Sequence, residues 1–153
     1  IYGYTACFRE TNDSIFLNFA KDIANMIMDR VKTEDAIPYW DYDAPVTKET
    51  PRDVSAASVT ASAMIELSTM VPDGQKYLDY AEKILKSLSS DAYLAKVGDN
   101  QGFILMHSVG SLPNGSEIDT PLNYADYYYL EALKRFMELK KLKVENGELR
   151  VIQ

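Results

Sequence analysis

Four consecutive residues, Trp40-Asp41-Tyr42-Asp43, alternate aromatic rings with carboxylates in a segment bounded by two prolines. In an extended segment, residues two apart point to the same side, so Asp41 and Asp43 would share one face and the rings the other. Aromatic rings beside carboxylates suit sugars, which present an apolar C–H face and a hydroxyl edge. The alternative is structural, with Trp40 and Tyr42 pinning the loop to the core and the aspartates capping turns.

A second group of polar residues lies in residues 97–119, where Gly, Pro, Ser and Asn are too dense for regular structure. His107 is the single histidine and has the chemistry of an acid or base near neutral pH. No Gly-x-Ser-x-Gly pattern surrounds Ser108, which disfavours a nucleophilic serine. We therefore expect a ligand-binding loop in which His107 orders the loop or touches the ligand.

Three charged residues are each open to two interpretations. Arg52 either holds an acidic group of a ligand or pairs with Asp53 or Glu49. Asp119 precedes Thr120, a predicted helix cap, and is interpreted as structural. Asp126 lies among tyrosines, where a buried, hydrogen-bonded anchor is favoured over a catalyst.

Composition excludes several classes of function. The 153 residues are 46% hydrophobic and 25% charged, which suits one domain with a real core. A net charge of −7 argues against a nucleic-acid partner and an anionic membrane surface, and no apolar run reaches the roughly 18 residues of a membrane helix. One cysteine and one histidine exclude an internal disulfide, a cysteine-based zinc site and a His-rich metal site. Periplasmic and cytoplasmic bacterial locations are both compatible with this composition.

The hydrophobic periodicity predicts a mostly helical chain with two long irregular segments, 33–49 and 97–119. Thr50-Pro51 and Thr120-Pro121 are typical helix starts, and Asp73 is the predicted cap of a third helix. Asn146-Gly147 between apolar residues predicts a C-terminal hairpin. The predicted helices cover about residues 1–10, 14–32, 50–70, 73–88 and 120–141.

The order of the connections predicts where the two polar segments lie. Every second connection is long and polar, while those near 10–13 and 71–73 are short. Alternate loops of antiparallel helical hairpins fall at the same end of the array. We therefore expect segments 33–49 and 97–119 to meet at one end.

Seven segments, taken in order, resemble the C-terminal portion of unsaturated glucuronyl hydrolases, glycoside hydrolase family 88. The resemblance extends over about residues 1–136. The segments are 1–5 (IYGYT), 8–11 (FRET), 38–45 (PYWDYDAP), 52–58 (RDVSAAS), 107–111 (HSVGS), 116–119 (SEID) and 121–133 (PLNYADYYYLEAL).

This resemblance implies an all-α fold, about half of an (α/α)6 toroid over residues 1–142, followed by a short β-hairpin or tail at 143–153. It implies hydration of the double bond of a 4,5-unsaturated uronic acid at the end of an oligosaccharide, by an aspartic acid and without metal or organic cofactor. The family's catalytic aspartates belong to its earlier half. No catalytic residue is therefore assigned here, and the chain is expected to be a fragment that is inactive alone.

The resemblance also implies that the loop before the last helix faces the substrate. The family's two serines and lysine for sulfated substrates fall at Ser111, Asn114 and Ser116, so only the first serine is kept and no sulfate preference is expected. The predicted substrate-binding set is Trp40, Asp41, Asp43, Arg52, His107, Ser108, Ser111, Asn114, Ser116 and Tyr124.

Two other functions and one assembly stay open from the sequence. One function is that of an unsaturated rhamnogalacturonyl hydrolase, and the other is a non-enzymatic helical module that binds carbohydrate or protein. An exposed half-toroid face would also favour a homo-oligomer.

Overall fold

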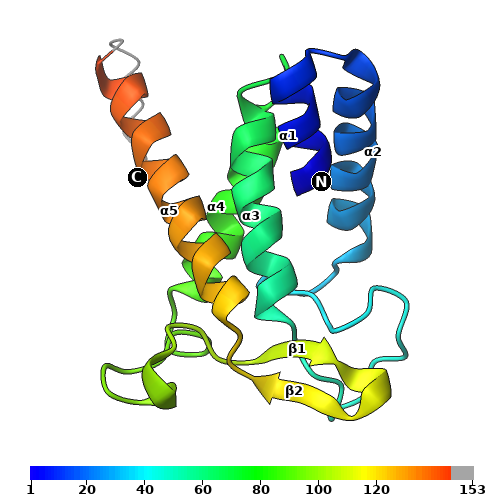
Figure 1. The fold of residues 1–153 in the computed structure, drawn as a ribbon, viewed down its shortest axis with the longest axis vertical. Coiled ribbons are helices and arrows are strands. Elements are labelled where there is room, and N and C mark those ends of the chain that lie inside the picture. The colour runs from blue at the N-terminus through cyan, green and yellow to red at the C-terminus, as the bar shows by residue number, and fades with distance from the viewer. Residues whose placement is uncertain (146–153) are drawn as a thin grey trace.

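A computed structural model describes residues 1–145, which fold into five α-helices and one two-stranded sheet (Figure 1). This confirms the predicted mostly helical class. None of the helices in these residues combines the length and apolar character needed to cross a bilayer. The elements are α1 (Tyr2–Thr11), α2 (Ser14–Arg30), α3 (Val54–Ser68), α4 (Gln75–Leu88), β1 (Ser108–Ser111), β2 (Ser116–Thr120) and α5 (Asn123–Glu145).

Helix α3 is the centre of the core and lies between α1 and α5 (Figure 1). It is buried on almost every side, as expected of a helix without a polar face. Ala57 and Ala61 are among the small side chains that let neighbouring helices approach its backbone. Helix α4 covers α3 with a single apolar face, as predicted: Tyr77, Leu78, Ala81, Ile84, Leu85 and Leu88 are buried.

The first two helices begin as the sequence predicts. Helix α1 has no side-chain hydrogen bond at its N-cap, Ile1. Asp13 caps α2, because its Oδ1 accepts a hydrogen bond of 2.9 Å from the Ile15 N–H. The helix ends at Arg30, close to the predicted end at residue 32.

The predicted starts of the third and fourth helices are wrong. Helix α3 begins at Val54 with Asp53 as its cap, because residues 51 and 52 belong to a short ladder instead. In that ladder Trp40 N–H donates to the Pro51 carbonyl at 3.1 Å, and Tyr39 pairs with Arg52. Helix α4 begins after Gly74, while Asp73 forms an ion pair with Lys76 at 2.8 Å.

The segment 97–119 is less irregular than predicted. Strands β1 and β2 pair antiparallel in it, with a shift of register between Ser108 and Val109. The predicted start at Thr120-Pro121 is also early, since Thr120 ends β2 and α5 begins at Asn123. Helix α5 continues to Glu145, so the expected end near residue 141 is wrong.

The predicted C-terminal hairpin falls largely on residues 146–153, which lie outside the described residues. Val144, predicted as one of its flanks, is helical. The division of the chain at residue 142 stays a prediction.

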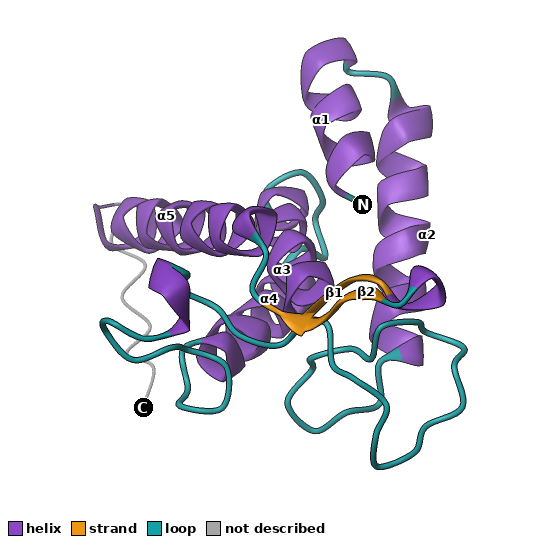
Figure 2. Cartoon of the chain, turned by 60° about the horizontal axis from the view of Figure 1, so that its bottom comes forward, coloured by secondary structure: helices purple, strands orange, loops and turns teal. Residues whose placement is uncertain are grey.

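Both polar segments lie at the same end of the helices, as predicted (Figure 1). We call residues 33–53 and 107–120 together the rim. Figure 2, in which this end comes forward, shows the hairpin beside the long loop. The Val54 N–H, which donates to the His107 carbonyl at 3.2 Å, joins the start of α3 to the hairpin.

We expect Asp53→Ala to lower the free energy of unfolding by about 2 kcal/mol, since it removes a helix cap and leaves buried donors without an acceptor. Thr50→Ala is the matched control, because Thr50 was the predicted cap and lies outside the helix. It should lower the free energy of unfolding by about 1 kcal/mol at most, because the Thr50 hydroxyl bonds only Thr47 and Pro45 of the exposed loop. Urea unfolding followed by circular dichroism measures both values, and an equal loss in the two variants would contradict the assignment of the cap.

Candidate functional site

The Asp53 carboxylate joins the two segments of the rim. Its Oδ1 accepts hydrogen bonds from the Ser55 N–H at 2.9 Å and the Ser55 hydroxyl at 2.7 Å. The same atom accepts from the Val109 N–H of β1 at 3.3 Å. Asp53 is only 8% exposed, so these bonds are shielded from water. The sequence does not reveal this link, although an Asp directly before an apolar helical segment is a preferred N-cap residue.

The Asp35 carboxylate anchors the long loop, residues 33–53, to the rest of the chain. It accepts hydrogen bonds from the Tyr93 hydroxyl at 2.5 Å and the Ile37 N–H at 3.1 Å, and Arg52 Nη1 lies 3.4 Å from its Oδ1. Burial acts to raise the pKa of Asp35, but the Tyr93 hydroxyl, the Ile37 N–H and the Arg52 charge outweigh it and hold the pKa below its ordinary value. Sequence reasoning did not find Asp35 or Tyr93, which are far apart in the chain.

The charge of Arg52 is engaged by groups within the loop. Besides Asp35, it donates to the Ile37 carbonyl, and its guanidinium lies over the Tyr39 ring at 4.5 Å from the centroid. Its ion-pair partner is therefore Asp35 and neither Asp53 nor Glu49, the two residues predicted.

The two aspartates of the aromatic segment have local partners. Asp41 Oδ1 accepts from the Asp43 N–H at 2.7 Å, which closes a turn. Asp43 Oδ2 pairs with Arg30 of α2 at 2.7 Å. Both carboxylates are exposed and Trp40 is half-buried. Asp41 thus closes a turn, as the structural interpretation has it, whereas Asp43 pairs with a helix instead; contact of either aspartate with a substrate stays a prediction.

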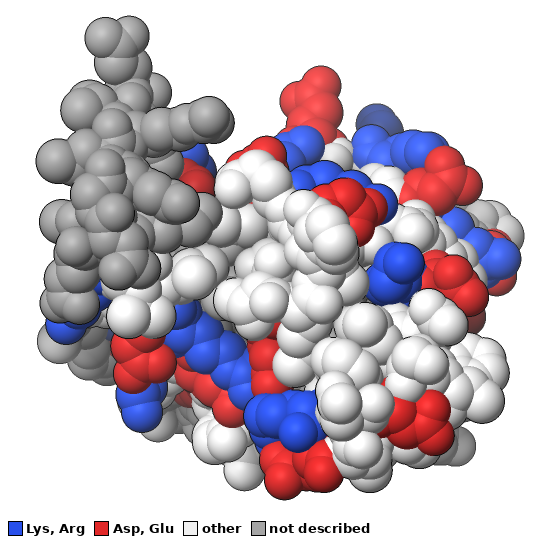
Figure 3. Space-filling view, turned by 90° about the horizontal axis from the view of Figure 1, so that it is seen from above, with Lys and Arg blue, Asp and Glu red and all other residues white. Residues whose placement is uncertain are grey.

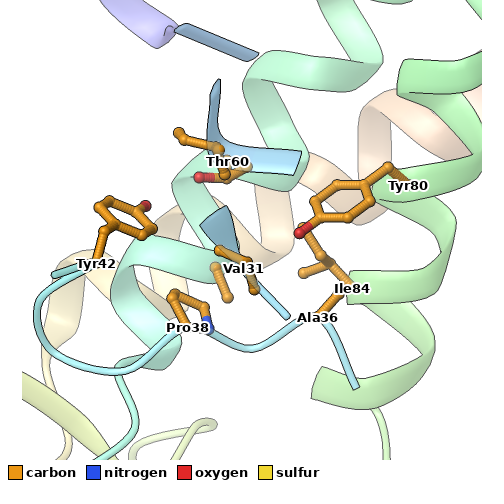
Figure 4. A pocket seen from close by; sticks show the side chains of 9 residues that line it. Val31, Ala36, Pro38, Tyr42, Thr60, Tyr80 and Ile84 are labelled. Atoms are coloured by element: carbon orange, nitrogen blue, oxygen red, sulfur yellow. The ribbon is translucent and has the colours of Figure 1, made fainter. Parts of the chain in front are cut away.

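Tyr42 folds back from the loop against the helices (Figure 4). It lines a crevice with Pro38, Thr60 of α3 and Tyr80 of α4 that is too narrow for a water-sized sphere. Burial raises the pKa of Tyr42, and it raises the pKa of Tyr80 to about 12. The Tyr80 hydroxyl has no hydrogen-bond partner among the described residues. Packing in this crevice therefore holds the loop against the helices, and the crevice has no room for a ligand.

The polar side chains of the β1–β2 hairpin differ in how far they are buried. His107 Nδ1 lies 2.5 Å from Asp119 Oδ1, an interaction that sequence reasoning did not find. The Asn114 amide donates to the Ser111 hydroxyl at 2.8 Å, and Ser116 is exposed at the start of β2. Ser108 is completely buried, and its hydroxyl has no partner within residues 1–145.

The first turns of α5 close the rim on its other side. Burial first, and then the carboxylates of Asp53 and Glu117, raise the pKa of Tyr124, which is 43% exposed. Asp126 accepts from the Ile104 and Leu105 N–H groups at 2.8 and 2.9 Å. This confirms Asp126 as the structural anchor that was predicted.

The rim is a surface of hydroxyls, carboxylates and aromatic rings, and Lys48 of the segment 33–53 is its one lysine and is exposed. Residues 98–123 contain no Lys or Arg, and Arg52 is engaged within the loop. At the opposite end of the molecule, basic and acidic side chains are intermixed (Figure 3). No group of three or more His, Cys, Asp or Glu side chains suited to a metal ion occurs in the described part of the chain. Chemically, the rim can stack on an apolar ring face and exchange hydrogen bonds with hydroxyl groups.

Comparison with known proteins gives one family model and a set of relatives. The model of glycosyl hydrolase family 47 matches residues 1–141. An unsaturated glucuronyl hydrolase from Formosa agariphila is 44% identical over 140 residues, which is 91% of this chain and 35% of the relative. An unsaturated chondroitin disaccharide hydrolase from Streptococcus agalactiae is 30% identical over 144 residues, 89% of this chain and 35% of the relative. The chain thus spans about 35% of the length of these curated relatives.

Solved structures give the same picture. A crystal structure of an unsaturated glucuronyl hydrolase specific for heparin is 60% identical, with a TM-score of 0.89 over 92% of this chain and 38% of that one. The unsaturated glucuronyl hydrolase of Bacillus sp. GL1 is 28% identical, with a TM-score of 0.80 over 95% of this chain and 37% of that one. The predicted likeness to unsaturated glucuronyl hydrolases is confirmed. The matching family model is that of family 47, so membership of family 88 stays a prediction.

Tyr93→Phe removes one of the bonds that hold the Asp35 carboxylate, and we expect it to lower the free energy of unfolding at neutral pH by about 2 kcal/mol. The lowered pKa of Asp35 contributes stability above the ordinary carboxyl range, and this is lost as the pH falls through that pKa. The difference between variant and wild type should therefore shrink below about pH 4.

Tyr129→Phe is the control, because its hydroxyl is 2.8 Å from the uncharged Ser89 hydroxyl. Its cost should be about 1 kcal/mol and the same at both pH values. Urea midpoints at pH 7 and about pH 3.5 give the comparison. A Tyr93→Phe deficit that persists unchanged at the lower pH would contradict the role of Asp35.

Proposed function

The chain belongs to glycosyl hydrolase family 47, whose model matches residues 1–141, and we propose that it is part of an enzyme of the unsaturated glucuronyl hydrolase type. Such an enzyme removes a 4,5-unsaturated uronic acid from oligosaccharides. The family model and the relatives point to different glycosidases. For the substrate we follow the relatives, because 60% identity with a TM-score of 0.89 over 92% of the chain ties both side chains and backbone to them. The likeness to family 88, which the sequence predicts, belongs to this proposal, because that is the family of the resembled enzymes.

In the proposed reaction, water adds across the enol-ether double bond. The hemiketal that results collapses and releases the rest of the glycan. We assign no proton transfer to a residue of this chain, because none of its aspartates matches a catalytic position of the resembled family. Its contribution is to bind and orient the glycan at the rim.

The geometry of the rim supports this contribution. Trp40 and the hairpin hydroxyls lie at one end of the helices, on segments fixed by Asp53 and Asp35. Because those carboxylates are already hydrogen-bonded, the loops are held in place before a ligand arrives, which lowers the entropic cost of binding. The relatives that carry the proposal are named for glucuronyl and chondroitin disaccharide hydrolysis.

Isothermal titration of the chain with an unsaturated uronyl disaccharide tests the proposal. We expect binding that is weakened about tenfold, or ~1.4 kcal/mol, by Trp40→Ala and by His107→Ala. Phe19→Ala is the matched control, since Phe19 is an aromatic residue, 47% exposed, on α2 outside the rim, and it should bind like wild type. The absence of binding at millimolar ligand would contradict a glycan-binding rim.

The same samples test turnover through the absorbance of the conjugated double bond. We expect no loss of absorbance with the chain alone, because it lacks matched catalytic aspartates. Turnover comparable with that of a complete unsaturated glucuronyl hydrolase would overturn this part of the proposal. If a longer protein that contains this chain bound the disaccharide but did not turn it over, the result would favour the non-enzymatic binding module.

A further inference from the structure

The base of the hairpin holds two side chains in an unusual backbone conformation. His107 has φ of 67° and Asp119 has φ of 51°, both in the left-handed region that non-glycine residues seldom occupy. Between these residues the strand register shifts at Ser108 and Val109. The two side chains meet with Nδ1 and Oδ1 2.5 Å apart. Strained backbone that brings two polar groups together is a recurring mark of functional sites.

The His107 ring is fixed on a second side by Tyr93. The rings meet edge to face with centroids 6.2 Å apart, and the Tyr93 hydroxyl is itself bound to Asp35 at 2.5 Å. Asp35 faces Arg52, so the ring is linked to the long loop of the rim. The His107 side chain is nevertheless 42% exposed.

These contacts determine which ring nitrogen is available. A carboxylate only accepts hydrogen bonds, so the proton shared with Asp119 belongs to Nδ1. A neutral imidazole with its proton on Nδ1 has its lone pair on Nε2. No hydrogen bond joins Nε2 to any of the described residues, whereas Nδ1 is bound to Asp119.

We propose that Asp119 is a positioning residue that fixes His107 in the Nδ1–H tautomer, so that Nε2 accepts a hydrogen bond from a hydroxyl of the glycan at the rim. The glycan part of this inference rests on the proposed function, and the tautomer does not. Asp119, interpreted from the sequence as structural, thereby acts on the ligand through His107.

The tautomer is measured by long-range ¹H–¹⁵N correlation of the imidazole at about pH 9, where imidazole is neutral. His107 is the only histidine of the chain, so its ring signals need no assignment. Asp119→Gly removes the carboxylate while glycine keeps the left-handed backbone without strain. Glu117→Gly is the matched control, because Glu117 lies in the same strand with φ of 52° and is not bound to His107.

We expect the Nδ1–H tautomer in the wild type and in Glu117→Gly, and its loss in Asp119→Gly. Asp119→Asn places an amide N–H donor beside Nδ1, so it should also lose the Nδ1–H tautomer although the side chain keeps its size. A wild-type ring with its proton on Nε2, or no change in Asp119→Gly, would overturn the positioning role.

Titration with the unsaturated uronyl disaccharide tests the ligand contact. The Nε2 signal should shift in the wild type and in Glu117→Gly, and Asp119→Gly should bind about fivefold more weakly. Equal affinity in Asp119→Gly, or a shift confined to Nδ1, would overturn the contact while leaving the proposed function standing. If the wild type bound no disaccharide, the proposed function and this contact would both fail, and the tautomer would still decide the positioning role.

Discussion

The rim depends on one buried carboxylate, that of Asp53. A single oxygen accepts from the Ser55 N–H of α3, from the Ser55 hydroxyl and from the Val109 N–H of β1, which lies 56 residues further along the chain. A carboxylate oxygen only accepts hydrogen bonds, whereas the hydroxyl of a Ser or Thr cap also carries a proton that needs an acceptor of its own. The start of the central helix and the position of β1 are therefore set by the same atom.

Away from the rim, the helices are joined by a separate polar network. Glu131 of α5 accepts from the Tyr2 hydroxyl at 3.0 Å and the Ser62 hydroxyl at 2.5 Å. Glu66 of α3 pairs with Arg135 at 2.8 Å and with Arg9 at 2.5 Å. These bonds join α1, α3 and α5 without involving the rim, so a change in the rim loops need not disturb the packing of the helices.

The sequence predicted the helices well, because their 3.6-residue period is a local property. It failed at the start of α3, since Thr50-Pro51 is a good cap only if no other segment pairs with Pro51 and Arg52, and residues 38–40 do. It also missed the hairpin, whose strands are short and rich in Ser and show no apolar alternation. The fold places the predicted site residues at one end of the helices, as expected, but the sequence did not predict their hydrogen-bond partners. Asp35 and Tyr93 are 58 residues apart, and only the fold shows that they meet.

The chain carries a net charge of −7, and the one arginine of its rim does little to offset this charge locally. Arg52 neutralises Asp35, stacks on Tyr39 and donates to a carbonyl, so little of its charge faces outward. The hairpin adds Glu117 and Asp119 and no cation. A carboxylate ligand placed against this surface would meet like charge, whereas hydroxyl groups would find acceptors. The hairpin side of the rim therefore suits the hydroxyl groups of a glycan better than a carboxylate, for which Lys48 in the segment 33–53 is the one exposed cation of the rim.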